Sequence, residues 1–123
     1  MHHIPTISDI HAAKEVIKQY LNPTPLYHYP RFSSKLGFDV YIKHENHQPT
    51  GSFKVRGGIN LISRMSREEK SAGVIAASTG NHGQSVAFAS QLFGVSCLIC
   101  SPEGANPDKV AAMEALGAKV VFH

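Results

Sequence analysis

Lys54 is the residue of this sequence that is best placed for covalent chemistry. It stands between Phe53 and Val55, in the first turn of a helix that the sequence predicts from Ser52 onward. The partial positive charge at a helix N-terminus disfavours an ammonium group, and apolar neighbours that exclude water disfavour it further. Both effects favour the neutral amine, which is the form that attacks a carbonyl carbon to make a Schiff base.

A pair of glycines follows Lys54 on the same side of this predicted helix. Gly57 and Gly58 come three and four residues after the lysine, so they share its face. A glycine inside a helix costs roughly 1 kcal/mol relative to alanine, which suggests that something approaches closely there. One interpretation is clearance for a broad, flat group beside the amine. The other is a surface lysine on a helix whose glycines allow tight packing against a neighbouring helix.

The second segment that could do chemistry is the loop Ser78-Thr79-Gly80-Asn81-His82-Gly83-Gln84. It joins a predicted strand to a helix that begins near Asn81, and it offers hydroxyl groups, a carboxamide and free backbone N–H groups. Such a helix N-terminus suits an anion, either a carboxylate or a phosphate. The loop lacks the G-x-G start of a dinucleotide loop and the Gly-Lys-Ser/Thr of a P-loop. An anion site and a merely well-capped helix are both consistent with it.

The second half of the chain alternates apolar strands with helices. From Gly73 the predicted order is strand, helix, strand, helix, strand, over residues 74–77, 84–93, 95–100, 107–116 and 118–122. Asn106-Pro107-Asp108 is a strong helix start, and Gly94 and Gly117 are typical of helix C-termini. Apolar strands connected by helices are typical of a parallel sheet between helix layers. The predicted fold class is α/β, with a parallel sheet in a three-layer α/β/α arrangement and the loop at the ligand-binding edge.

In the first half of the chain the sequence predicts helices, short strands and a turn. Ser8 is expected to cap a helix that ends before Pro23, with an apolar face formed by Ile10, Ala13, Ile17 and Leu21. There follow a strand over 26–29, one or two helical turns over 31–36, a strand over 39–44, and a turn at 49–51. Ser52 is the predicted N-cap of the next helix, whose apolar stripe consists of Ile59, Ile62 and Met65.

Charge and composition exclude several classes of function. The 123 residues carry a formal net charge of +3, and their 42% hydrophobic content suits one folded unit. No cluster of lysines and arginines forms a surface for nucleic acid, and no apolar run reaches the roughly 20 residues that span a membrane. The sequence does not start with a signal-peptide pattern. We therefore expect a soluble, cytoplasmic protein.

The cysteines and most histidines do not predict a redox or metal site. Cys97 and Cys100 stand three residues apart in a predicted strand, so they should point to opposite faces as inert core residues. His44 and His47 lack the i, i+4 spacing of a metalloprotease helix. No metal ligands are predicted.

Two segments together resemble one enzyme family. Residues 45–58 (ENHQPTGSFKVRGG) and 77–84 (ASTGNHGQ) closely resemble the threonine dehydratase and serine racemase family of pyridoxal-phosphate enzymes, which have the tryptophan synthase β-like fold type II. The likeness covers nearly the whole chain. Pro25-Leu26, Leu36-Gly37, Ser101-Pro102, Lys109 and residues 117–121 also match that family in order and spacing.

The resemblance implies a role for each matching residue. Lys54 would hold pyridoxal phosphate through a Schiff base and later remove the Cα proton of the substrate. Phe53 would pack near the cofactor, and Asn81 would hydrogen-bond its ring hydroxyl. The substrate carboxylate would be bound by Ser78, Thr79, Gly80, Asn81 and His82, partly through main-chain N–H groups.

The family pattern extends beyond this chain. In the family, a second glycine-rich loop that grips the cofactor phosphate and a polar residue facing the pyridine nitrogen come from sequence well past position 123. We therefore expect an N-terminal part of a longer enzyme, apparently truncated. Residues 1–50 would belong to the larger domain of the family fold, and residues 51–123 would form most of the smaller, cofactor-binding and substrate-binding domain.

The implied activity is an ammonia-lyase that converts L-threonine or L-serine into a 2-oxo acid and ammonia by β-elimination. One alternative is a serine racemase or a 3-hydroxyaspartate dehydratase. Thr79 favours elimination, because serine racemases carry a serine at this position as the second proton donor. Another alternative is a non-catalytic, truncated domain. The family is often dimeric or tetrameric, so a homo-oligomer is expected of the full-length form.

Overall fold

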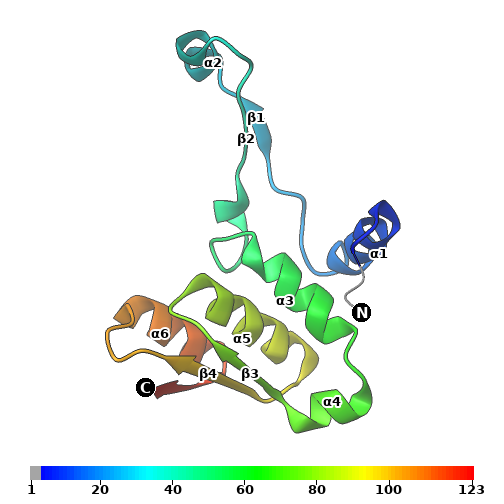
Figure 1. Ribbon diagram of the computed structural model, residues 1–123, viewed down its shortest axis with the longest axis vertical. Coiled ribbons are helices and arrows are strands. Elements are labelled where there is room, and N and C mark those ends of the chain that lie inside the picture. The colour runs from blue at the N-terminus through cyan, green and yellow to red at the C-terminus, as the bar shows by residue number, and fades with distance from the viewer. Residues whose placement is uncertain (1–3) are drawn as a thin grey trace.

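The computed structural model describes residues 4–123. Figure 1 shows a body, in which helices pack beside a small sheet, and an arm that projects from it. The helices are α1 (Ile7–Ile17), α2 (Pro30–Leu36), α3 (Lys54–Ser63), α4 (Arg67–Ala72), α5 (Asn81–Phe93) and α6 (Pro107–Ala115), with a short 3-10 helix, η1 (Glu45–His47). The strands are β1 (Leu26–His28), β2 (Tyr41–Lys43), β3 (Val74–Ala77), β4 (Cys97–Ser101) and β5 (Lys119–Phe122).

The second half of the chain forms the βαβαβ unit that the sequence predicts. Strands β3, β4 and β5 lie in that order in a parallel sheet, with Ala76 opposite Ile99 and Ile99 opposite Val120. Helices α5 and α6 pack against each other and against these strands. On β3, by contrast, the side chain of Ile75 is 73% exposed. The α/β class and the parallel sheet are confirmed, and within residues 4–123 the helices cover the face that carries Ile99.

The core lies where α3 and α5 pack together. Val55, Ile59 and Ile62 of α3 are fully buried, so the stripe predicted for this helix does face the core, with Met65 packed at its margin. Gly58 allows the two helices to come close, because a Cβ there would lie only 2.5 Å from the carbonyl oxygen of Ser85. This close contact fixes the start of α3 relative to α5.

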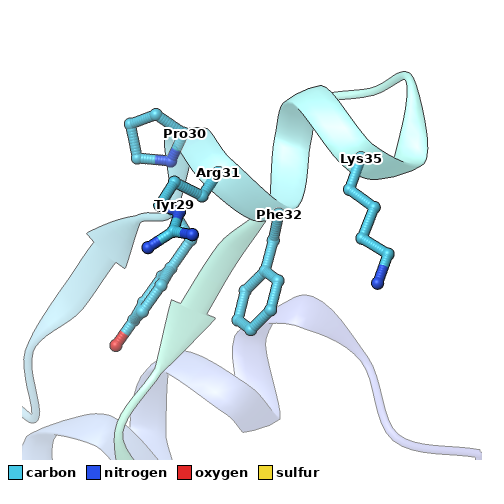
Figure 2. A pocket seen from close by; sticks show the side chains of 5 residues that line it. All are labelled: Tyr29, Pro30, Arg31, Phe32 and Lys35. Carbon is cyan, nitrogen blue, oxygen red and sulfur yellow. The ribbon is translucent and has the colours of Figure 1, made fainter.

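The arm consists of β1, α2 and β2. The two strands pair antiparallel, with Tyr27 opposite Ile42, and α2 forms the tip (Figure 1). Figure 2 shows Tyr29 and Phe32 on the same side of the tip, and their rings stack with centroids 5.7 Å apart. Six large side chains of the arm are at least half exposed: Leu26, Tyr27, Phe32, Leu36, Phe38 and Tyr41.

Glu45 fastens the base of the arm to α3. Its carboxylate accepts two hydrogen bonds of 2.8 Å from the Arg56 guanidinium and one of 2.5 Å from Thr24 Oγ1, and Lys43 Nζ lies 3.8 Å away. Hydrogen bonding to Arg56 is the main cause that lowers the pKa of Glu45 to about 2. The same bond raises the pKa of Arg56. This cluster holds the segment that leads into Lys54.

Two predicted helix caps are wrong. Thr6, not Ser8, caps α1: its Oγ1 accepts a bond from the Asp9 N–H, and the Asp9 carboxylate accepts one from the Thr6 N–H. Helix α1 ends at Ile17, earlier than the predicted stop before Pro23. Helix α3 begins at Lys54 without a side-chain cap, and Ser52 Oγ is buried with no hydrogen-bond partner in residues 4–123.

Helix α4 was not predicted, although its signature was readable. Ser66 caps it by accepting a bond from the Glu69 N–H, and the Glu69 carboxylate accepts one from the Ser66 N–H. A serine followed three residues later by a glutamate is typical of such a start. The helix has only 6 residues, too few to show an apolar period.

The cysteines lie as the sequence predicts. Burial alternates along β4, with Cys97 buried and Cys100 partly buried, so they point to opposite faces as free thiols. Burial raises the pKa of the Cys97 thiol. None of the helices described between residues 4 and 123 is both long enough and apolar enough to cross a bilayer.

Candidate active site

Lys54 occupies the first position of α3, as predicted. Ser85 Oγ of α5 donates a hydrogen bond of 2.5 Å to the carbonyl oxygen of Lys54, so the lysine backbone is held against α5. The side chain is exposed, and no described residue accepts a hydrogen bond from its Nζ. The exclusion of water expected around this amine is therefore not provided by residues 4–123, since Phe53 is itself 61% exposed.

A pocket of about 400 Å³ lies beside Lys54 between α3 and α5. It is lined by Phe53, Lys54, Arg56, Gly57, Gly58, Leu61, His82 and Val86. Most of this lining is apolar, and its polar residues are Lys54, Arg56 and His82. The structure thus brings Lys54 together with His82 of the predicted anion loop.

The two glycines after Lys54 have different surroundings. Apart from the adjoining residues and the backbone of α3, no atom lies within 4 Å of the place where a Cβ of Gly57 would be, and Gly57 lines the pocket. A Cβ on Gly58 would instead collide with Ser85. Gly57 therefore fits the interpretation of open space beside the amine, whereas Gly58 fits the interpretation of tight packing between helices.

The loop after β3 is shaped by Ser78. Its Oγ accepts hydrogen bonds from the N–H groups of Gly80, at 3.1 Å, and Gly83, at 2.8 Å. The N–H groups of Thr79, Asn81 and His82 have no partner in the described chain. At the N-terminus of a 13-residue helix, three unpaired donors suit an anion.

The predicted carboxylate ligands divide between two openings. His82 borders the pocket that contains Lys54, whereas Ser78 and Thr79 border a second opening of about 560 Å³ at the carboxyl ends of the strands. Gly80 and Asn81 line neither of these two openings. A third opening, drawn in Figure 2, lies at the arm tip between Tyr29 and Lys35. That opening contains none of the predicted site residues.

Sequence reasoning gave no role to Lys109, which the structure places at the loop. Its Nζ donates a hydrogen bond of 2.7 Å to Asn81 Oδ1, across a separation of 28 residues. No spacing rule connects residues this far apart, because the contact depends on how α6 packs beside α5. Lys109 therefore adds a cationic side chain to the anion loop, near the pocket that Lys54 and Arg56 line.

Comparison with known proteins assigns this chain to one enzyme family. A profile of the family described as "Pyridoxal-phosphate dependent enzyme" matches residues 17–123. L-threo-3-hydroxyaspartate ammonia-lyase of Saccharomyces cerevisiae is 42% identical over 118 residues, which are 96% of this chain and 36% of that protein. L-threonine ammonia-lyase of Thermotoga maritima is 42% identical over 117 residues, 95% of this chain and 29% of that protein. The chain thus spans about a third of the length of these relatives.

Solved structures give the same result for the fold. The serine racemase of Dictyostelium discoideum superposes with a TM-score of 0.90 at 39% identity, over 95% of this chain and 38% of that one. The processed form of threonine deaminase isoform 2 from Solanum lycopersicum superposes with a TM-score of 0.81 at 35% identity, over 97% of this chain and 34% of that one. Coverage this high includes the arm as well as the body.

Proposed function

The chain belongs to the pyridoxal-phosphate dependent enzymes, and from that premise we propose that it is the lysine-bearing part of an L-threonine or L-serine ammonia-lyase. The observation that carries this proposal is the shared pocket of Lys54 and His82. It joins a free amine to a loop with unpaired N–H donors. A cofactor that is held covalently through its carbonyl carbon needs the amine, and a substrate carboxylate needs the N–H donors.

The described residues fit this cofactor. The amine of Lys54 is exposed without a hydrogen-bond partner among them, the adjoining pocket is mostly apolar, and the space at Gly57 is open. A flat aromatic ring needs an apolar slot beside the reactive amine, and Phe53 at the pocket edge offers a ring to pack against. When bound, pyridoxal phosphate supplies the electron sink for the pair of electrons left on the substrate Cα.

The residues of this chain would then act in turn. Lys54 holds the cofactor through its Nζ and, once released, takes the proton from the substrate Cα. The N–H groups of Thr79, Asn81 and His82 bind the substrate carboxylate, aided by the positive end of the α5 dipole. Ser78 and Gly80 keep the loop in shape, and Asn81 donates to the ring hydroxyl.

In the proposed reaction the β-hydroxyl leaves as water, and a water molecule then replaces the amino nitrogen, which leaves as ammonia. L-threonine would give 2-oxobutanoate and ammonia, and L-serine would give pyruvate and ammonia. Binding of the carboxylate at the loop holds the Cα–H bond toward Lys54, so that one amine serves as both anchor and base.

A second candidate is racemisation of serine, or elimination from 3-hydroxyaspartate. The relative in yeast is named for the second activity and the Dictyostelium structure for the first. Racemisation needs a proton donor on the face opposite Lys54. We propose that Thr79, a bulkier and more hindered alcohol than serine, favours elimination. Keto-acid release measured against D-serine formation distinguishes the two.

We also propose the division of the chain that the family fold suggests. Residues 1–50, which include the arm, would pack in the larger domain, and residues 51–123 would form most of the smaller one. The exposed apolar side chains of the arm support this, because a two-stranded ribbon of three-residue strands is not stable in water without cover. In full-length form a homo-oligomer is proposed.

Titration of the chain with pyridoxal phosphate tests the proposed function. The absorbance of a Schiff base should rise to one equivalent per chain and should be lost in Lys54→Gln. Lys119→Gln removes another exposed lysine, in strand β5 at the edge of the sheet, and should leave the titration unchanged. Equal loss in both variants would contradict a specific site.

A further inference from the structure

Lys109 approaches the anion loop along a defined path. Asn106 Oδ1 accepts hydrogen bonds from the N–H groups of Asp108, at 2.9 Å, and Lys109, at 3.2 Å, which fixes the backbone of Lys109 in the first turn of α6. Its Cγ and Cδ atoms then lie 3.8 Å from the place where a Cβ of Gly80 would be. The side chain therefore crosses the turn at Gly80 before its Nζ reaches Asn81.

The contact with Asn81 determines which half of the carboxamide remains available. The Oδ1 atom accepts from the Lys109 ammonium at 2.7 Å, and a carbonyl oxygen bound by a cation keeps that partner in preference to a neutral donor. The Nδ2 group carries two N–H bonds and no acceptor. Because Oδ1 already has a cationic partner, Asn81 is available to a ligand mainly through its Nδ2–H donors, and polarisation by the ammonium strengthens that donation.

The ammonium of Lys109 also has no counter-ion nearby. Among residues 4–123 no carboxylate lies within ion-pair distance of its Nζ. Its charge is therefore not neutralised by the protein and adds to the positive potential of the α5 N-terminus.

We propose that Lys109 is a positioning residue for Asn81, which it holds with Nδ2 directed to an acceptor on the bound cofactor or substrate. The nature of that acceptor, a ring oxygen, rests on the proposed function. The orientation itself depends only on contacts within this chain. Lys109 thus leaves Asn81 to meet a ligand mainly through its Nδ2–H donors, which suits an acceptor oxygen.

The orientation is tested first without cofactor. In the ¹⁵N-labelled chain, the side-chain Nδ2 resonances of Asn81 should move in Lys109→Met and should be retained in Lys109→Arg, which keeps a cationic donor. Lys119→Met is the matched control, because it removes the same charge from strand β5 at the edge of the sheet and should leave Asn81 unchanged. Asn81 resonances that are identical in Lys109→Met and the wild type would overturn the proposal.

A second readout uses the Schiff base at Lys54. Donation of a hydrogen bond from Asn81 to the ring oxygen would stabilise negative charge on that oxygen and so would lower the pKa of the imine nitrogen. Lys109→Met should therefore raise the pKa of the Schiff base by about 0.5, and Lys109→Arg should restore it. An unchanged pKa in Lys109→Met would count against the orientation. If the wild type forms no Schiff base, the proposed function fails, while the Asn81 resonances still decide the role of Lys109.

Discussion

Gly57 and Gly58 illustrate how neighbouring residues of one type meet different demands. Gly58 faces the carbonyl oxygen and the hydroxyl of Ser85, and Ser85 in turn donates to the Lys54 carbonyl. Gly57 faces open space beside the amine. The first glycine of the pair would serve the cofactor and the second the fold, so substitutions should separate the two roles.

Replacing Gly58 with alanine should destabilise the fold. The new methyl would lie 2.5 Å from a backbone oxygen of Ser85, and forced overpacking typically costs about 1–3 kcal/mol. Gly57→Ala is the matched control, and it should stabilise the helix by about 0.5–1 kcal/mol while reducing Schiff-base formation at Lys54. Urea denaturation and pyridoxal phosphate titration measure the two effects. Equal stability changes in both variants would contradict this separation.

Glu45 should make the free energy of unfolding of the chain depend on pH in the acid range. Because bonding to Arg56 lowers its pKa from 4.5 to about 2 in the folded chain, ionised Glu45 stabilises the fold above pH 4.5 and loses this effect as the pH falls toward 2. The wild type should thus lose on the order of 1–3 kcal/mol more than Glu45→Gln across this range. Denaturation at several pH values measures it.

The control for this pH dependence is Glu103→Gln. Glu103 is exposed and forms no ion pair with any described residue, so its variant should follow the wild type. Parallel curves for Glu45→Gln and the wild type would show that the cluster with Arg56 does not form in solution.

The helices and strands show which signals in a sequence are reliable. The strand over 74–77 and the helix start at Asn106 were predicted at the positions found. An apolar run indicates the strand, and capping residues mark where the helix begins. The cap of α1 was misplaced because Thr6 and Ser8 both lie near its start, whereas α3 has no side-chain cap at all. Only the backbone geometry decides between Thr6 and Ser8.

The site could be predicted only in part for a similar reason. Lys54 and the Ser78–Gln84 loop lie in continuous motifs, so the sequence displays them directly. The contacts of Lys109 with Asn81 and of Ser85 with Lys54 join residues 28 and 31 positions apart. They arise from the packing of α3, α5 and α6, which no local spacing encodes.

The cap of α1 can be tested by replacing each of the two candidate residues with alanine in turn. Thr6→Ala should destabilise the chain by about 1 kcal/mol, because it removes the acceptor of the Asp9 N–H. Ser8→Ala should have no such effect, since Ser8 lies inside α1. Thermal unfolding followed by circular dichroism measures both. A larger loss in Ser8→Ala would mean that the helix starts later than described.

For the whole molecule, the contrast between body and arm is the main feature. The body has a packed core around Ile59, Ile62 and Ile99. The arm projects from it (Figure 1), and most of its large apolar side chains are exposed. Regions with few buried contacts open more readily than the core. In this chain the arm should therefore be the first part to unfold.

Hydrogen exchange tests this order of stability. The amides of Tyr27 and Ile42, which pair in the arm, should exchange much faster than those of Ile99 and its neighbours in β4. Mass spectrometry of peptic peptides resolves the two regions. Equal protection would mean that the arm is covered in solution, for example by a second copy of the chain.

The central claim is that this chain carries a specific lysine for pyridoxal phosphate. The most direct measurement is to mix the chain with the cofactor at one equivalent, reduce with borohydride, and map the modified lysine by mass spectrometry. We predict that the cofactor mass is found on Lys54 and that it is lost from this peptide when Lys54 is replaced by arginine. A cofactor mass spread over exposed lysines such as Lys35 and Lys119, with no excess on Lys54, would contradict the account.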